Sequence, residues 1–246
     1  MTVKHIKIKV NHEQSFCEIP LAGTNLRSLI SLAQAGYMGD KRPEGFHNYL
    51  ALVKELGLEQ RTILRLKQVH SQGIVLIKKR EDSLLNYLEG DGFISCLKEP
   101  ILAITVADCL PILLYDEGDN VFGLLHSGWR GTGILMQAFK FVKEAFQIEA
   151  RQLRLCFGPA IGSCCYRVPE ERYQYFLNNF GKKAVRFDGK DFFLDLREAN
   201  LWFATDANVK EVTVIDNCTC CEEYFGSYRR QGKEVFCNML VMLGYF

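Results

Sequence analysis

Two imidazoles and one thiol stand at the ends or in the middle of hydrophobic segments. His70 follows the run ILRLKQV, Cys109 lies in ADCLPILLYD (residues 107–116), and His126 lies in LLHSGWRGTG (residues 124–133). Zinc accepts thiolate and imidazole in tetrahedral sites, and a catalytic zinc site keeps its fourth position open. The wide separation of these three residues does not match a zinc finger and favours a site assembled from the ends of several strands.

Charged residues lie next to these candidate ligands and could take part in the chemistry of the site. Asp108 precedes Cys109 and places a carboxylate in an apolar segment, where burial requires a partner. Arg130 lies in the glycine-rich turn after the second histidine, and its guanidinium fork suits an anion such as phosphate. The same turn opens a predicted helix, whose N-terminus also favours anions. The alternative interpretation is a plain turn with Thr132 as the N-cap.

The same residue types also fit nucleophilic catalysis without metal. Cys109 would be the nucleophile, His126 or His70 the base, and Asp108 the residue that orients the base. A thiolate that ligates zinc is poorly available for attack, so the metal content of the protein separates the two hypotheses.

The other cysteines carry less information. The chain has ten cysteines and no secretory signal pattern, so we expect reduced thiols. The segment FGPAIGSCCYRV (157–168) is typical of a tight connection with buried thiols. The C-x-C-C cluster at Cys218, Cys220 and Cys221 does not have the spacing of a zinc knuckle, and we expect no second metal site there. The paired arginines in FGSYRRQGK hold phosphate or form a solvated turn.

Composition excludes several classes of protein. The 246 residues are 48% hydrophobic and carry a net charge of +1, without a basic face or tail of the kind that binds nucleic acid. No apolar stretch is long enough to cross a membrane, and the first residues lack the apolar core of a signal peptide. The sequence therefore predicts a cytoplasmic protein with one domain over residues 1–246.

Hydrophobic periodicity predicts the elements that must position the candidate ligands. Strand patterns cover residues 3–10, 63–71, 73–79, 101–108, 111–117, 120–128, 151–159 and 211–217. Helix patterns cover residues 44–57, 131–147, 169–180 and 195–207, and the tail at 234–246 fits a strand or a helix. Strands and helices do not alternate strictly, which favours an α/β (α+β) fold: a layered sandwich with mixed β-sheets flanked by helices.

Seven motifs in order resemble those of the laccase-domain family, long labelled multicopper polyphenol oxidase-like. They run from His70 to about Arg230: KQVHS, DGFIS, ADCLPILLYD, LHSGWRGTG, GPAIGSCCY, NCT and FGSYRR. The resemblance implies a single-domain, layered α/β architecture with mixed sheets. It also implies a metal site formed by His70, Cys109 and His126, the three residues that their chemistry nominates.

The resemblance implies an enzyme of purine nucleosides and phosphate. The family is associated with phosphorolysis of adenosine, inosine, guanosine and methylthioadenosine, and with deamination of adenosine. We expect Zn²⁺ as cofactor, with Cu²⁺ as the alternative ion. Cys109 would hold the metal, Asp108 would orient a ligand or accept a proton, and Arg130 would bind phosphate or the transition state. The older label implies copper-dependent oxidation of phenols, but a laccase needs about ten histidines and this chain has five.

The chain departs from the family pattern at two places. Asn48-Tyr49 stands where members often carry Asn-Arg, and Phe236-Cys237 stands where they often carry Gly-Arg. If either arginine helps to hold substrate, the rate or preference of this protein differs from that of its relatives. The sequence leaves the preferred nucleoside and the oligomeric state open.

Overall fold

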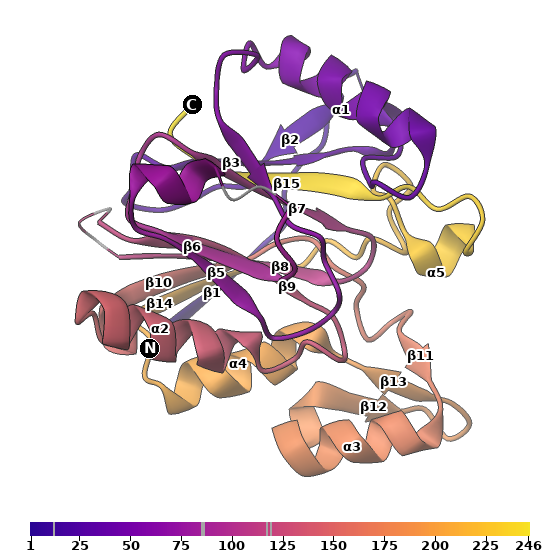
Figure 1. The fold of residues 1–246 in the computed structure, drawn as a ribbon. Helices are drawn as coiled ribbons and strands as arrows, with labels where there is room; N and C mark the ends of the chain where they lie inside the picture. Colours follow the sequence, from indigo (N-terminus) through magenta and orange to yellow (C-terminus); the bar gives the residue numbers. More distant parts are fainter. Residues whose placement is uncertain (12, 85–86, 117, 119) are drawn as a thin grey trace.

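Two large β-sheets form the centre of the molecule (Figure 1). The computed structural model describes residues 1–11, 13–84, 87–116, 118 and 120–246. Within these residues, one sheet has seven strands in the order β1 (Thr2–Ile6), β14 (Glu211–Ile215), β10 (Leu153–Phe157), β8 (Leu110–Asp116), β9 (Phe122–Ser127), β6 (Gly92–Ser95), β5 (Ile74–Ile77). The other has five, in the order β2 (Phe16–Glu18), β3 (Arg27–Ser31), β15 (Met239–Gly244), β7 (Ile101–Val106), β4 (Ile63–Arg65).

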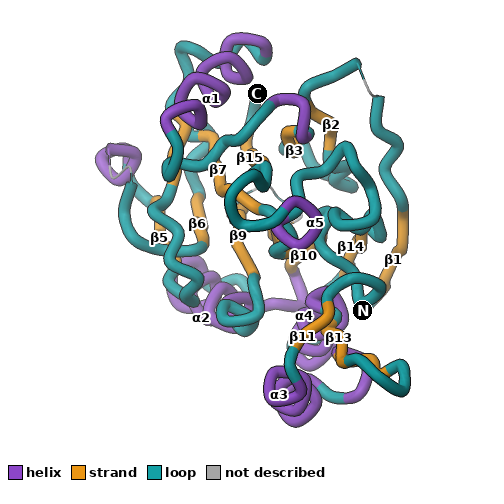
Figure 2. Tube along the Cα trace, turned by 90° about the vertical axis from the view of Figure 1, so that its right-hand side faces the viewer, coloured by secondary structure: helices purple, strands orange, loops and turns teal. Residues whose placement is uncertain are grey.

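Helices cover the outer faces of the two sheets. These covering helices are α1 (Pro43–Glu55), α2 (Ile134–Phe146) and α4 (Leu196–Asp206), and the remaining helices are α3 (Glu170–Phe180) and the short α5 (Tyr228–Gln231). In Figure 1, α1 lies above the five-stranded sheet, and α2 and α4 lie below the seven-stranded sheet. A small sheet of β11 (Arg167–Val168), β13 (Phe192–Leu194) and β12 (Val185–Phe187) packs with α3 at one side (Figure 2). The structure thus confirms the expected layered sandwich with mixed sheets.

Burial on both faces explains why the central strands are continuous apolar runs. Along β8, Ile112 and Leu114 pack in the cluster between this sheet and α2, whereas Leu113 and Tyr115 pack in the cluster between the two sheets. Successive side chains of a strand point to opposite faces, and here both faces are dry. The predicted end of this strand at residue 117 lies outside the described residues.

The C-terminal tail forms a strand for the same reason. β15 lies between β3 and β7 in the middle of the five-stranded sheet, and all six of its residues are buried. Val241 faces the layer between the sheets, and Met242 faces the layer under α1. Because both faces are apolar, the tail shows neither strand nor helix periodicity in its sequence.

Most of the predicted elements are shorter in the structure; the strand predicted over 3–10, for example, ends at Ile6. The helix predicted from residue 131 begins at Ile134, because Gly133 has a φ of 113° and interrupts helical geometry. Gly133 is the N-cap, so Thr132 does not cap the helix; its hydroxyl donates to the carbonyl of Gly128 at 2.9 Å. The strand predicted over 63–71 ends at Arg65, after which the chain leaves the sheet.

Several elements were not predicted. β2, β3, β6 and the small sheet are short, and short strands carry little periodic signal. In the described part of the chain, no helix is both long enough and apolar enough to cross a membrane.

Candidate metal centre

One end of the seven-stranded sheet gathers the candidate ligands. β8, β9, β6 and β5 are neighbours, with β9 antiparallel to both β8 and β6 and β5 parallel to β6. Cys109 directly precedes β8, His126 is near the end of β9, and His70 lies in the segment before β5. This topology brings residues from distant parts of the sequence to the same end of the sheet.

The three predicted ligands meet in the structure. The ligand atoms of His70, Cys109 and His126 all lie within 4.8 Å of one another. The two imidazole rings are edge to face, with centroids 4.9 Å apart and planes at 79°. His126 is buried, Cys109 is half-buried and His70 is exposed, so the site opens to solvent on the His70 side. One thiolate and two imidazoles at these separations fit a Zn²⁺ ion with one open position.

A carboxylate that the sequence reasoning missed orients this site. Asp91, fully buried directly before β6, accepts a hydrogen bond from His126 Nδ1 at 2.9 Å. It also accepts from the backbone N–H groups of Val69, His70 and Ser71, and from the Ser71 hydroxyl. One side chain therefore holds both histidines, and it leaves His126 Nε2 free to face the thiol. Its signal in the sequence is an acidic residue directly before a buried strand, in DGFIS.

The electrostatics of the site favour an ion pair between thiolate and imidazolium. Burial raises the pKa of Cys109, but the charge of His126 and hydrogen bonds from His126 and His70 outweigh burial and lower it. Burial lowers the pKa of His126, but the Cys109 thiolate and the bond to Asp91 outweigh burial and raise it. The pKa of Asp91 is lowered to about 2: burial raises it, and the hydrogen bonds from His126 and Ser71 more than offset that effect.

Gly128 lies directly beside the candidate ligands Cys109 and His70. A Cβ at this position would lie 2.9 Å from Cys109 Sγ and 3.6 Å from His70 Cδ2. The glycine therefore leaves the space that the thiol occupies. The backbone at His70 is itself unusual, because its φ of 60° is rare for a residue with a side chain. Bonds from its N–H and its neighbours to Asp91 hold it there.

Asp108 directly precedes the candidate ligand Cys109, but its carboxylate is hydrogen-bonded to other groups. Its carboxylate accepts from the Thr219 hydroxyl at 2.7 Å and from the Arg229 N–H at 2.6 Å. Its φ is 80°, in the left-handed region, so the turn into Cys109 is strained. Asp108 thus ties the turn that carries Cys109 to the segment after β14, and the carboxylate bonded to His126 is that of Asp91.

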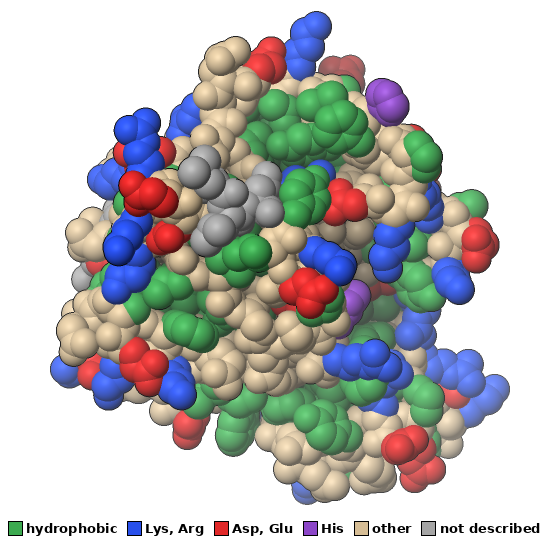
Figure 3. Space-filling view, viewed as in Figure 1, with side chains coloured by type: hydrophobic (Ala, Val, Ile, Leu, Met, Phe, Trp, Pro, Cys, Tyr) green, Lys and Arg blue, Asp and Glu red, His purple; other side chains and the backbone are tan. Residues whose placement is uncertain are grey.

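Arg130 belongs to a group of arginines and aromatic rings near the candidate metal centre. Its guanidinium is exposed and lies 5.1 Å from the centre of the Trp129 ring, and that of Arg172 lies 3.9 Å from the same ring. Arg172 also donates to Tyr166, and the guanidinium of Arg229 lies 5.5 Å from the centre of the Tyr166 ring. Figure 3 shows several basic side chains at the lower right of the molecule, toward the small sheet.

Both departures from the family pattern are contacted by arginines from other segments. The guanidinium of Arg65 lies 4.8 Å from the centre of the Tyr49 ring. Arg42 lies 5.1 Å from the centre of the Phe236 ring and donates to the Phe236 carbonyl. Positive charge is therefore present beside both positions at which a family arginine is missing.

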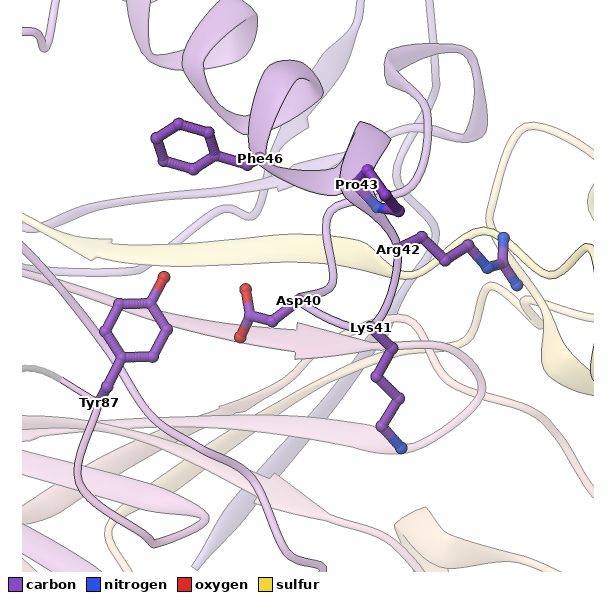
Figure 4. Close-up of a pocket in the computed structure, with 6 residues that line it drawn as sticks. All are labelled: Asp40, Lys41, Arg42, Pro43, Phe46 and Tyr87. Carbon is purple, nitrogen blue, oxygen red and sulfur yellow. The ribbon is translucent and has the colours of Figure 1, made fainter.

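An open pocket of about 460 Å³ lies beside the first turn of α1. Figure 4 shows Asp40 and Tyr87 facing each other across it, while Arg42 points away toward the C-terminal segment. The lining residues are Asp40, Lys41, Arg42, Pro43, Phe46 and Tyr87. None of them is a candidate metal ligand, so this pocket is separate from the candidate metal centre.

Comparison with known proteins identifies the family of this chain. The family model described as multi-copper polyphenol oxidoreductase laccase matches residues 22–243. A purine nucleoside phosphorylase of Borreliella burgdorferi is 36% identical over 171 residues, which are 67% of this chain and 72% of that protein. Another of Clostridium acetobutylicum is 34% identical over 174 residues, 68% of this chain and 71% of that protein. The crystal structure of YlmD from Geobacillus stearothermophilus matches with a TM-score of 0.85 at 25% identity, over 97% of this chain and 99% of that one. The chain belongs to the multi-copper polyphenol oxidoreductase laccase family.

Proposed function

We propose that this protein is a zinc-dependent purine nucleoside phosphorylase that also deaminates adenosine. Its substrates would be adenosine, inosine, guanosine and methylthioadenosine, with phosphate as the second substrate. The observation that carries the proposal is the convergence of His70, Cys109 and His126, oriented by Asp91, in a chain whose relatives are named purine nucleoside phosphorylases.

The donor set suits zinc. Three protein ligands from one thiolate and two imidazoles leave one coordination position for water or substrate. A zinc ion held there supplies Lewis-acid chemistry, by lowering the pKa of water or polarising a substrate oxygen. Asp91 fixes the tautomer of His126, so that Nδ1–H donates to the carboxylate and Nε2 is the ligand.

Arginines supply the positive charge that phosphate requires. We assign Arg172 and Arg229 to phosphate binding together with Arg130, because Arg172 and Arg229 both contact Tyr166, which lies close enough to the Cys109 thiolate to feel its charge. A guanidinium binds phosphate oxygens through two parallel hydrogen bonds. The phosphate so held would attack C1′ of the ribose, and the purine would leave with the electrons of the broken C–N bond.

Tyr166 is suited to assist the leaving purine. Burial and the nearby Cys109 thiolate raise its pKa, although Arg172 and Arg229 partly offset this effect. The hydroxyl is therefore protonated at neutral pH and can donate a hydrogen bond to a purine nitrogen. We assign Asp108 a positioning role, because both of its carboxylate oxygens are engaged by Thr219 and Arg229 beside the metal ligand Cys109.

The structure favours a metal-free Cys-His enzyme as the second candidate. Cys109, His126 and Asp91 form a line of hydrogen bonds from thiol to imidazole to carboxylate, as in enzymes with a cysteine nucleophile. A copper-dependent phenol oxidase is less favoured, because His5 and His47 bond to Asp216 and to the Pro43 carbonyl, away from the centre.

Product analysis tests the proposal. The purified protein is incubated with adenosine in the presence and absence of phosphate, before and after treatment with a strong chelator. We expect adenine and ribose 1-phosphate when phosphate is present, inosine from deamination, and neither after chelation or in Cys109→Ala. Turnover that survives complete removal of metal would favour the Cys-His enzyme. Rapid oxidation of phenols by the copper-loaded protein, without nucleoside turnover, would favour the oxidase.

A further inference from the structure

Two cysteine-bearing turns lie together at the same end of the seven-stranded sheet. β10 and β14 are parallel neighbours, so the segments that follow them start side by side. A β-bridge pairs Ala160 with Cys218, and the Thr219 N–H donates to the Ala160 carbonyl at 3.2 Å. The first turn carries Cys164 and Cys165, and the second carries Cys218, Cys220 and Cys221.

Four of these five thiols converge. The sulfurs of Cys164, Cys165, Cys218 and Cys221 all lie within 4.8 Å of one another. Cys164 Sγ is 3.5 Å from that of Cys218 and 3.6 Å from that of Cys221, and Cys165 Sγ is 3.3 Å from that of Cys221. Four sulfurs at about 2.3 Å from one tetrahedral ion lie about 3.8 Å apart. The observed cluster therefore has the dimensions of a site for a single ion.

The second turn has the local form of a metal-binding knuckle. Cys218 and Cys221 are spaced C-x-x-C, the spacing of ligand pairs in structural zinc sites. The Gly162 N–H donates to Cys218 Sγ at 3.2 Å, and the N–H groups of Cys220 and Cys221 bond to the same sulfur. Backbone donors stabilise the thiolate, which is the form that binds metal. The expectation of no second metal site rested on the C-x-C-C spacing, within which Cys218 and Cys221 form this C-x-x-C pair.

A buried cation lies beside the cluster, where the charges of Asp195, Cys218, Asp216 and Cys164 act on it. Arg197 is 7% exposed and donates to the carbonyls of Ala160 and Asn217, which flank the two turns. Among the described residues, its Nε has no hydrogen-bond partner. Four thiolates around a divalent ion carry a net charge of −2, which suits a neighbouring guanidinium.

From the four sulfurs, the C-x-x-C pair and the buried arginine, we infer that Cys164, Cys165, Cys218 and Cys221 bind a second, structural Zn²⁺ ion. With all four positions filled by protein, this ion is closed to substrate. The second turn is connected to the segment that carries Cys109, because the hydroxyl of Thr219, which lies between Cys218 and Cys221, donates to the Asp108 carboxylate. The Ile161 N–H, in the segment before Cys164, donates to the Asp108 carbonyl at 3.0 Å. The second ion would thus stabilise the turn that carries Cys109.

Metal counting and X-ray absorption test this site. The full chain is produced with zinc under reducing conditions, and zinc per chain is measured by mass spectrometry. We expect two ions in the wild type, one in Cys109→Ala and one in the double variant Cys164→Ser/Cys221→Ser. Cys220→Ser is the matched control, and it should keep both ions. The zinc remaining in Cys109→Ala should have four sulfur neighbours at about 2.3 Å.

The wild type alone also decides the question, should a variant fail to fold. Its zinc absorption spectrum should show about 2.5 sulfurs per zinc, the mean of four and one. One zinc per chain in the wild type with a mixed nitrogen and sulfur shell, or such a shell around the zinc left in Cys109→Ala, would overturn the inference, whereas one zinc with four sulfur neighbours would instead count against the site at His70, Cys109 and His126. Loss of a zinc ion in Cys220→Ser, or an intact mass of the reduced-purified protein that shows disulfides among these cysteines, would also overturn the inference.

Discussion

Replacing Asp91 by asparagine tests whether one carboxylate organises the metal centre. Asparagine has nearly the same shape as aspartate, but its amide nitrogen cannot accept a hydrogen bond. One carboxylate oxygen accepts from His70 and His126, and the other accepts from Val69 and twice from Ser71. Whichever oxygen is replaced, at least two bonds to a buried charge are lost, at about 1.5–3 kcal/mol each.

Two measurable effects follow from Asp91→Asn. The free energy of unfolding should fall by about 3–5 kcal/mol, allowing for partial relaxation of the loop at residues 69–71. Zinc affinity should fall about 10- to 100-fold, because the partner that fixes the tautomer and direction of His126 is weakened. Chemical denaturation measures the first effect, and titration against a competing zinc indicator measures the second.

Asp116→Asn is the matched control. Asp116 is also buried and accepts from the backbone N–H groups of Gly118, Asn120 and Val121, but it lies at the far end of β8. At about 3.3 Å per residue, that end is roughly 20 Å from Cys109. The control should lose stability and keep its zinc affinity. Equal zinc affinity in Asp91→Asn and in the control would refute the assignment of Asp91.

Three further predictions follow from the same geometry. Gly128→Ala should lower zinc affinity at least about tenfold, measured by indicator titration, since its Cβ meets the Cys109 sulfur. Zinc affinity should rise with pH between about 7 and 9, because His126 has a raised pKa and zinc must displace its proton. Calorimetry in buffers of different ionisation enthalpy should show that about one proton is released for each zinc ion bound. Folding lowers the pKa of Asp91 from 3.8 to about 2, so the stabilisation linked to its ionisation is complete above about pH 4 and lost toward pH 2. The difference in unfolding free energy between the wild type and Asp91→Asn, followed by denaturation, should therefore narrow over that window.

The convergence of His70, Cys109 and His126 was predictable because each stands at the end or in the middle of an apolar run. The strands at 101–106 and 110–116 are buried on both faces, so their hydrophobic runs are unambiguous, and Cys109 lies between them. The motifs around His70 and His126 supplied the rest of the ligand set.

What escaped prediction depends on register and on contacts between distant segments. Asp91 meets His126 because β6 and β9 pair antiparallel, and nothing local in DGFIS specifies that pairing. Likewise, Cys164 and Cys165 meet Cys218 and Cys221 only because β10 and β14 are neighbours. The start of α2 was misplaced because the positive φ of Gly133 is a property of the folded turn.

The most direct test of the account is the dependence of phosphorolysis on zinc at the Cys109 site. Metal-free protein is titrated with zinc while ribose 1-phosphate production from inosine and phosphate is followed, in parallel with Cys109→Ala. We predict no activity before zinc is added, recovery that saturates at two ions per chain or fewer, and no recovery in Cys109→Ala. Full activity in protein shown to be free of metal, or recovery by zinc in Cys109→Ala, would contradict the central claim.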